Sequence, residues 1–269
     1  MIMLIEDTYK LMLKYSFKPD KSKDQYFIIN QEITEKIISL LNINNEDVIL
    51  EIGPGIGNLT KQLINTNAKK IIAIDKDKLM CDILKKEINS EKLEIINGDF
   101  LDVDLERIHF TKITGLIPYS ISNGIIDKIN ATKPCVFVTQ KEFAEKLVAD
   151  AGFKNYVAIS VLTQTYGNAK IEMNVSRKNF YPIPNVDSVI VSVLPKRDRQ
   201  EQNFNYFVKT IFRFSNKDLI NEIKYGQNVN KDFFEKIDVN KIPKEYFKKK
   251  IKQLSPEAIQ DVWDSLSKK

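Results

Sequence analysis

The sequence predicts an α/β protein in which helices cover both faces of a largely parallel sheet, followed by a small helical domain at the C-terminus. Three observations predict this class. Short apolar runs alternate with stretches of helical periodicity through most of the chain, as in successive βαβ units. A turn rich in glycine follows the first of these apolar runs. From about residue 200 the pattern becomes helical and rich in lysine.

The order of the elements follows from the spacing of the apolar residues. Isoleucines and leucines three or four positions apart predict a first helix over 31–42. Beyond it, short apolar runs predict strands, and the periodic stretches between them predict helices. In chain order these elements are strand 48–52, helix 59–64, strand 70–74, helix 78–88, strands 93–96 and 112–117, helix 125–129, strand 135–138, helix 142–148 and a terminal strand over 187–194.

The change of pattern near residue 200 predicts two domains, 1–198 and 199–269. Charge is also uneven along the chain. Residues 173–269 hold 19 Lys and Arg against 12 Asp and Glu, whereas the rest of the chain holds 22 against 24. A basic C-terminal third suggests a polyanionic partner, of which nucleic acid is the commonest. A lysine-rich surface that serves solubility alone is the alternative.

The composition is that of a globular protein, with 43% hydrophobic and 29% charged residues. Two cysteines, Cys81 and Cys135, are too few for a disulfide framework and fit a reducing compartment. The apolar run at 1–5 is too short for a signal peptide, and no apolar stretch approaches the length of a membrane span. We therefore expect a cytoplasmic protein without a membrane partner.

The glycine-rich turn contains Gly53, Gly55 and Gly57, between a predicted strand and a predicted helix. Glycines there allow a tight turn and the close approach of a ligand. A dinucleotide-binding turn has the spacing G-x-G-x-x-G, but here the third glycine comes one residue early. The spacing therefore disfavours a dinucleotide-dependent oxidoreductase. A purely structural turn is the alternative.

Two aspartates follow the next two predicted strands. Asp75 ends the strand after the glycine turn and can accept hydrogen bonds from both hydroxyls of a ribose. Asp99 follows the third strand, where its carboxylate can accept a hydrogen bond from an adenine amino group. Each alone could be a helix cap or a turn residue. Together with the glycines they lie along one edge of the sheet and predict a site for a cofactor that contains a nucleoside.

Three further segments resemble a known family. Residues 24–28 read Asp-Gln-Tyr-Phe-Ile, similar to a Gly-Gln-x-Phe-Leu segment, and 180–188 match the pattern Phe-x-Pro-x-Pro-x-Val-x-Ser throughout. Residues 115–119, Gly-Leu-Ile-Pro-Tyr, nearly match the Asn-Leu-Pro-Tyr box of enzymes that methylate adenine amino groups. With the glycine turn, these segments resemble the ribosomal RNA adenine N6,N6-dimethyltransferase family, to which the erythromycin-resistance methyltransferases are related. The resemblance covers about 23–194 and continues more faintly beyond.

The resemblance implies a Rossmann-like sheet that binds S-adenosyl-L-methionine, and no metal ion. It implies transfer of methyl groups to the N6 amino groups of two adjacent adenines near the 3′ end of small-subunit ribosomal RNA. The partner would be that RNA or a pre-small-subunit particle, and the chain a monomer. The implied cofactor residues are Gln25, Tyr26, Ile28, Gly53, Gly55, Gly57, Asp75, Asp99 and Leu116. The implied catalytic residues are Leu116, Ile117, Pro118, Tyr119 and Phe180.

In the resemblance, Tyr119 and Phe180 would stack on the two faces of an extruded adenine, and the two prolines after Phe180 would stiffen its loop. A polar side chain at position 116 and the carbonyl of residue 117 would hold the amino hydrogens. Leu116 has no acceptor, so we expect weakened chemistry. Family arginines are also missing near 156–161 and 214–217, and Lys248, Lys249, Lys250 and Lys252 either replace these phosphate contacts or form a solvated face.

Two other functions compete with an active enzyme. A catalytically weak or inactive ribosome-assembly factor would bind pre-ribosomal RNA and cofactor, and Leu116 favours this alternative. A DNA adenine methyltransferase uses a similar box. The pattern at 180–188 and the absence of an inserted target-recognition region argue against the DNA enzyme.

Overall fold

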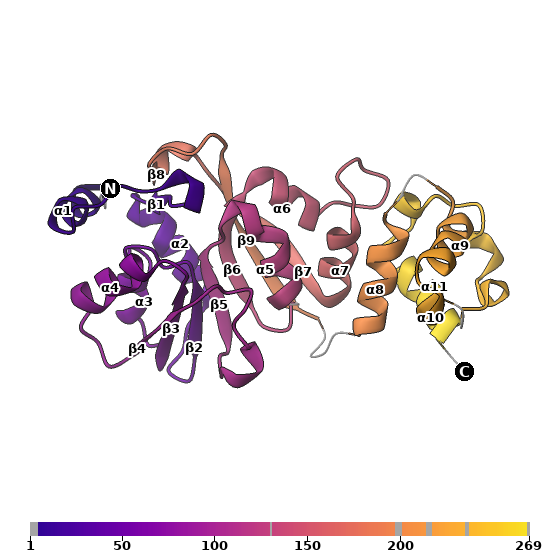
Figure 1. Cartoon of the computed structure of the whole chain (residues 1–269), viewed down its shortest axis with the longest axis horizontal. Coiled ribbons are helices and arrows are strands. Elements are labelled where there is room, and N and C mark those ends of the chain that lie inside the picture. The colour runs from indigo at the N-terminus through magenta and orange to yellow at the C-terminus, as the bar shows by residue number, and fades with distance from the viewer. Residues whose placement is uncertain (1–4, 130, 197–200, 214–216, 235–236, 268–269) are drawn as a thin grey trace. The chain divides into compact units, whose positions relative to one another are not determined.

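The computed structural model describes residues 5–129, 131–196, 201–213, 217–234 and 237–267 (Figure 1). The chain forms two compact units. The first comprises Met1–Ala144 and Lys170–Leu194, and the second comprises Glu145–Ala169 and Pro195–Lys269.

A seven-stranded sheet has the strand order β4-β3-β2-β5-β6-β9-β7, and its first five strands are parallel. Strand β9 pairs antiparallel to β6. All five residues of β2 are buried, as expected for a central strand covered on both faces. The strands are β2 Val48–Ile52, β3 Lys70–Asp75, β4 Leu93–Asn97, β5 Lys112–Leu116, β6 Cys135–Gln140, β7 Gly167–Val175 and β9 Ser188–Pro195.

The helices of the first unit cap and cover this sheet. Helix α2 packs on β6, α3 on β3 and α4 on β4. Asn30 and Asp77 cap α2 and α4 by accepting hydrogen bonds from the amides of Glu32 and Leu79. The α-helices are α1 Ile5–Lys14, α2 Gln31–Leu41, α3 Thr60–Ile64, α4 Lys78–Glu87, α5 Ser122–Ile129 and α6 Lys141–Leu147, the last of which ends in the second unit.

A separate two-stranded sheet joins segments far apart in the sequence. Strand β1, Phe27–Ile28, pairs antiparallel with β8, Phe180–Tyr181. Ile28 lies opposite Phe180, and both belong to a buried core cluster that includes residues of α2 and β6. The segments 24–28 and 180–188 singled out in the sequence are therefore neighbours in the fold.

The second unit is helical and packs around aromatic side chains. Phe204, Phe207 and Phe234 are fully buried. The ring centroids of Phe207 and Trp263 lie 5.2 Å apart. Helix α7 belongs to this unit, because the Tyr166 ring contacts Phe204. Its helices are α7 Ala158–Tyr166, α8 Gln202–Ile211, α9 Leu219–Val229, α10 Lys231–Phe234 and α11 Pro256–Ser267. The division into a domain at 1–198 and an RNA-binding domain at 199–269 stays a prediction.

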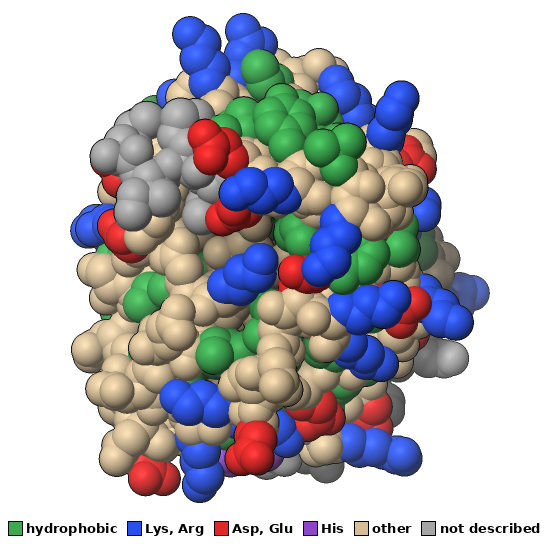
Figure 2. All heavy atoms as spheres, turned by 90° about the vertical axis from the view of Figure 1, so that its left-hand side faces the viewer, with side chains coloured by type: hydrophobic (Ala, Val, Ile, Leu, Met, Phe, Trp, Pro, Cys, Tyr) green, Lys and Arg blue, Asp and Glu red, His purple; other side chains and the backbone are tan. Residues whose placement is uncertain are grey.

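Short 3-10 helices complete both units: Lys21–Lys23, Leu105–Arg107, Tyr119–Ile121, Arg177–Asn179, Val239–Lys241, Lys244–Tyr246 and Ile251–Gln253. Within the described ranges, no helix is both long and apolar enough to cross a membrane. The face in Figure 2 carries lysine and arginine side chains scattered among acidic side chains and apolar patches, so it is not uniformly basic.

Candidate active site

The glycine turn after β2 adopts a conformation that side chains disfavour. Gly53, Gly55 and Gly57 have φ angles of +64°, +56° and +86°. A Cβ atom at Gly57 would lie 2.7 Å from the Leu84 side chain, and one at Gly55 would lie 3.0 Å from the Phe27 ring. Glycine is therefore needed for this turn to pack between α4 and the N-terminal segment.

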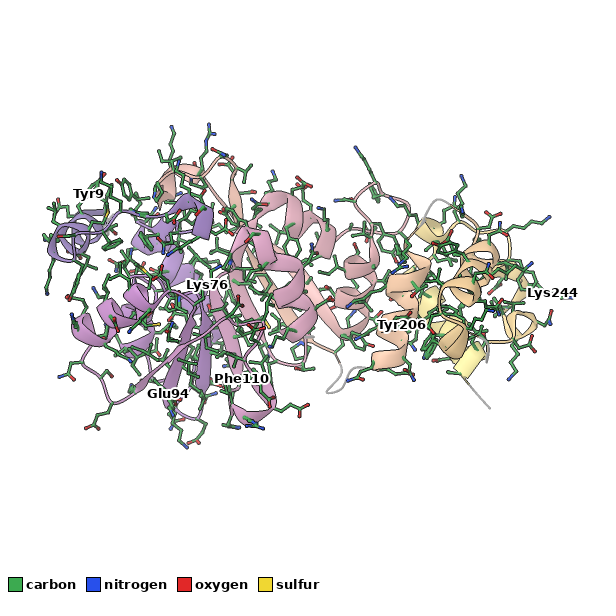
Figure 3. All side chains as sticks on the ribbon, viewed as in Figure 1. Tyr9, Lys76, Glu94, Phe110, Tyr206 and Lys244 are labelled. Carbon is green, nitrogen blue, oxygen red and sulfur yellow. The ribbon has the colours of Figure 1, made fainter. Side chains whose placement is uncertain are left out.

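A pocket opens beside this turn, at the carboxyl ends of the parallel strands. In Figure 3, Lys76 marks this end of the sheet and Glu94 the opposite end. Eight of the residues expected to hold the cofactor line the pocket, namely Gln25, Tyr26, Ile28, Gly53, Gly55, Asp75, Asp99 and Leu116. Gly57 does not line it and instead packs against α4.

The two predicted carboxylates, Asp75 and Asp99, line this pocket and have unused hydrogen-bond acceptor capacity. Asp75 is half-buried and accepts hydrogen bonds from the amides of Gly55, at 3.1 Å, and Asp77, at 2.9 Å. Burial raises the pKa of Asp75, although these two amides oppose the shift. Among the described residues, the Asp99 carboxylate accepts one hydrogen bond, from the Leu101 amide at 2.9 Å. Each carboxylate can therefore accept further hydrogen bonds from a ligand.

The Gln25 side chain contacts protein on both sides. Its amide nitrogen donates to Asp77 Oδ2 at 2.9 Å, and its oxygen accepts a hydrogen bond from the Asp20 amide at 2.8 Å. Lys23 Nζ also lies 2.9 Å from Asp77 Oδ2. Asp77 thus anchors the segment that covers the pocket, and Gln25 holds that segment in place.

The pocket also contains a buried acid that was not predicted from the sequence. Glu51 is only 1% exposed, and its Oε2 atom has no hydrogen-bond partner among the described residues. Burial raises the pKa of Glu51 to about 8, with Thr60 opposing and Asp75 adding to the shift. A glutamate inside the apolar strand 48–52 is the signal that could have found it.

A second, smaller pocket adjoins the first and shares Asp24, Tyr26, Leu116 and Pro118 with it. Four further residues, Ile117, Tyr119, Val138 and Phe180, complete its lining. The structure therefore gathers every residue predicted to be catalytic around one small pocket, at the end of β5 and next to the larger one.

The backbone of the box at 116–119 is held from one side. The Ile117 amide donates to the Val138 carbonyl at 3.0 Å. The Ile117 carbonyl accepts no hydrogen bond from any described residue. Leu116 is half-buried, and its side chain packs against the core. The box thus presents a free backbone carbonyl but no polar side chain from position 116.

The aromatic walls differ in part from the expected sandwich. Tyr119 is fixed by a 2.6 Å hydrogen bond between its hydroxyl and Ser188 Oγ, and its ring stacks on Tyr26 at 5.8 Å and 23°. Phe180 lines the smaller pocket but is only 1% exposed and belongs to the core. In this structure the ring stacked on Tyr119 is therefore Tyr26, and truncating Phe180 would disturb folding as well as any base contact.

Comparison with known proteins assigns the fold and the motifs to one family. The sequence model of the family described as "Ribosomal RNA adenine dimethylase" matches residues 16–266. The chain belongs to this family.

Its relatives include two archaeal proteins named "Probable ribosomal RNA small subunit methyltransferase A". That of Pyrococcus furiosus is 34% identical over 267 residues, which cover 96% of both chains. That of Methanosarcina mazei is 33% identical over 259 residues, with 94% of both chains covered.

Solved structures of similar fold include a dimethyladenosine transferase from Plasmodium falciparum, with a TM-score of 0.72 and 28% identity over 87% of this chain and 94% of that one. The 23S rRNA methyltransferase ErmE has a TM-score of 0.65 at 20% identity, covering 90% of this chain and 100% of that chain, and shows the shared fold alone.

Ribosomal RNA adenine dimethylases use S-adenosyl-L-methionine, and the larger pocket fits this cofactor. S-adenosylmethionine carries a positive sulfonium and an ammonium group beside its adenosine. The unpartnered Glu51 oxygen supplies a buried acceptor, and a Cβ atom on Gly53 or Gly55 would intrude on the close packing of the turn. Asp75 and Asp99 add acceptors suited to ribose hydroxyls and an adenine amino group.

Replacing Asp75 with alanine is expected to weaken cofactor binding by about 10- to 100-fold, because a charged acceptor is worth about 1.5–3 kcal/mol. Calorimetric titration with S-adenosylmethionine measures the change. The matched control is Asp102→Ala, since Asp102 is exposed and lies outside the pocket. Equal affinity of the Asp75 variant and the natural chain would rule out contact between Asp75 and the ribose.

Proposed function

We propose that this chain transfers methyl groups from S-adenosylmethionine to the N6 amino groups of two adjacent adenines near the 3′ end of small-subunit ribosomal RNA. The observation that carries the proposal is the smaller pocket. It joins the cofactor pocket, has aromatic walls at Tyr26 and Tyr119, and contains the free carbonyl of Ile117. A flat base with an amino group at its edge is the ligand that such a pocket suits.

For methyl transfer, the protein has to orient the amino nitrogen of the target adenine. The lone pair of the adenine amino group is delocalised into the ring, which makes that nitrogen a poor nucleophile. When bound, the cofactor supplies an electrophilic methyl group. The Ile117 carbonyl holds one amino hydrogen and turns the nitrogen toward the cofactor pocket, while Tyr119 stacks on the base. Stacking contributes about 1–3 kcal/mol per base.

RNA would be held by the basic C-terminal part of the chain. Of the four candidate lysines in the second unit, Lys248, Lys249 and Lys250 are exposed, and Lys252 is half-buried and donates a hydrogen bond to the Lys154 carbonyl. We assign them to phosphate contacts on small-subunit RNA or a pre-small-subunit particle, bound by a monomer of this chain. A catalytically weak or inactive assembly factor is the second candidate, favoured by the apolar packing of Leu116.

The test is transfer of labelled methyl from S-adenosylmethionine to unmethylated small ribosomal subunits. Transfer to two adjacent adenines supports the proposal. If the natural chain binds cofactor and subunits but transfers nothing, the assembly-factor function is favoured instead.

In the same assay, Leu116→Asn is expected to raise the rate, because it adds a polar acceptor at the end of β5. The full effect of one aligned hydrogen-bonding group, about 100- to 1000-fold, is the upper limit of this gain. Leu116→Met keeps an apolar side chain of similar size and is expected to give no increase. A rate for Leu116→Asn at or below that of the natural chain, at equal cofactor affinity, would contradict the attenuation by Leu116.

A further inference from the structure

Asp24 occupies a position that the sequence motif reserves for glycine. It begins the segment that resembles Gly-Gln-x-Phe-Leu, and it ends the 3-10 helix Lys21–Lys23 with a left-handed φ of +55°. Aspartate tolerates this conformation better than most residues do. The substitution therefore keeps the turn and adds a carboxylate where the family pattern has no side chain.

That carboxylate is fixed by one of its two oxygens. Asp24 Oδ2 accepts hydrogen bonds from the Ser120 amide at 3.0 Å and from Ser120 Oγ at 2.6 Å. Ser120 directly follows Tyr119 at the end of the box. Oδ1 accepts no hydrogen bond from a described residue. Asp24 thus ties the covering segment to the box and keeps a second oxygen free.

This second oxygen belongs to Asp24, which lines both pockets. Among the described residues around the smaller pocket, Asp24 is the one carboxylate; the others are aliphatic or aromatic. The Tyr119 hydroxyl is already bonded to Ser188. Asp24 is therefore the strongest side-chain acceptor next to the pocket in which Leu116 provides none.

We propose that Asp24 is a catalytic residue of this chain, and that its Oδ1 atom accepts one hydrogen of the target amino group in place of the missing side-chain acceptor at position 116. This inference rests on the proposed function. The Ile117 carbonyl accepts a hydrogen bond from the other amino hydrogen. As the nitrogen–carbon bond forms, the carbon–sulfur bond breaks and its electron pair stays on sulfur. The methylated nitrogen then releases one proton, which the adjacent Asp24 carboxylate accepts and passes to water.

The direct test is Asp24→Asn, assayed by methyl transfer to unmethylated small subunits. Asparagine has the same size, tolerates a left-handed φ and can still accept from Ser120 through its one carbonyl oxygen. It then presents an NH2 donor where Oδ1 accepted. We expect the rate to fall by about 100- to 1000-fold, while calorimetric affinity for S-adenosylmethionine changes by less than about threefold.

Ser120→Ala separates an acceptor from a positioning role. It removes the hydroxyl donor but keeps the carboxylate and the bond from the backbone amide. If Asp24 acts as an acceptor, Ser120→Ala loses less than about tenfold in rate, well below the loss of one aligned catalytic group. A loss as large as that of Asp24→Asn would mean that Asp24 only positions the box, and would overturn the proposal.

A rescue experiment covers any folding defect. In an Asp24→Gly background, Leu116→Asn restores a side-chain acceptor at the smaller pocket and is expected to raise the rate by about 100-fold or more. In the natural background, where Asp24 already serves, the same change is expected to gain less than about tenfold. Equal gains in the two backgrounds would overturn the role of Asp24.

The remaining outcomes separate this inference from the proposed function. If the natural chain transfers methyl groups and Asp24→Asn does so equally well, the role of Asp24 is overturned and the methyltransferase function stands. If the natural chain binds cofactor and subunits but transfers nothing, both are overturned.

Discussion

Replacing Gly115 with alanine is expected to destabilise the first unit by about 2–5 kcal/mol. Gly115 lies in β5 with a φ of +142°, which L-residues rarely adopt. A Cβ atom there would lie 2.1 Å from the Ile52 carbonyl oxygen and 2.9 Å from the Ile52 amide nitrogen. Because both neighbours are backbone, β2 and β5 would have to separate, and overpacking of this kind adds about 1–3 kcal/mol or more to about 1–2 kcal/mol of conformational strain.

Two other glycines separate the steric effect from the conformational one. Gly152 has a φ of +93° but nothing within 4 Å of an added Cβ, so Gly152→Ala should cost only about 1–2 kcal/mol. Gly98 lies in the first unit, and its added Cβ would meet only Val103 at an ordinary 3.7 Å. Urea unfolding compares the three variants. A loss at Gly115 no larger than that at Gly152 would contradict the backbone clash.

The close approach of β2 and β5 at Gly115 also sets the positions of the glycine turn and the box at 116–119. Ile52 pairs with Gly115, so the glycine turn after β2 and the box after β5 leave the sheet side by side. A Cβ atom on Gly53 would lie 3.1 Å from the Leu116 carbonyl oxygen. If Gly115→Ala folds at all, we therefore expect it to lose cofactor affinity too.

Most of the sheet could be predicted from the sequence, because its strands are buried runs of branched residues. Strands β2 to β6 and β9 lie within one or two residues of the predicted ranges. Strand β7 was not predicted, since its sequence Gly-Asn-Ala-Lys-Ile-Glu-Met-Asn-Val is largely polar and it lies at the edge of the sheet. Helix α7 also went unpredicted, because it is buried almost all round and its buried positions include serine and threonine, which weakens a periodic apolar signal.

Part of the candidate site could likewise be predicted from the sequence, and part could not. Gly53, Gly55, Asp75 and Asp99 could be placed together because parallel strands end at one edge. Contacts between distant segments could not. The Asp24–Ser120 hydrogen bonds join residues 96 apart in sequence, and no local pattern encodes them. The stacking of Tyr26 on Tyr119 depends on the same closure of the N-terminal segment over the box.

Replacing Glu51 with glutamine is expected to stabilise the cofactor-free protein at high pH and to flatten its pH dependence. Burial raises the pKa of Glu51 from 4.5 to about 8. Below pH 4.5 the carboxyl is protonated in both folded and unfolded chains and costs nothing. Between 4.5 and about 8 the unfolded chain ionises while the folded one keeps its proton, so stability falls as pH rises.

Above about pH 8 the full cost applies, about 5 kcal/mol at about 1.4 kcal/mol per pH unit. Glutamine has no such titration. Urea unfolding should therefore show a gain for Glu51→Gln of about 1 kcal/mol near pH 5 and about 5 kcal/mol near pH 9. A gain that does not grow with pH would contradict the raised pKa.

The raised pKa of Glu51 should also be visible when the cofactor binds. A cationic ligand in the pocket favours the ionised form of Glu51, because the charge then has a partner in a site that water does not reach. Near pH 7 the natural chain should therefore release close to one proton when it binds S-adenosylmethionine, and the Glu51→Gln variant none. Calorimetry in buffers of different ionisation enthalpy measures this release.

Because glutamine also removes the charge, the variant should bind the cofactor about 10- to 100-fold more weakly while being the more stable protein. Tighter folding with weaker binding would identify Glu51 as a residue retained for its ligand at the expense of the fold, whereas unchanged proton release would mean that the buried acid does not sense the cofactor.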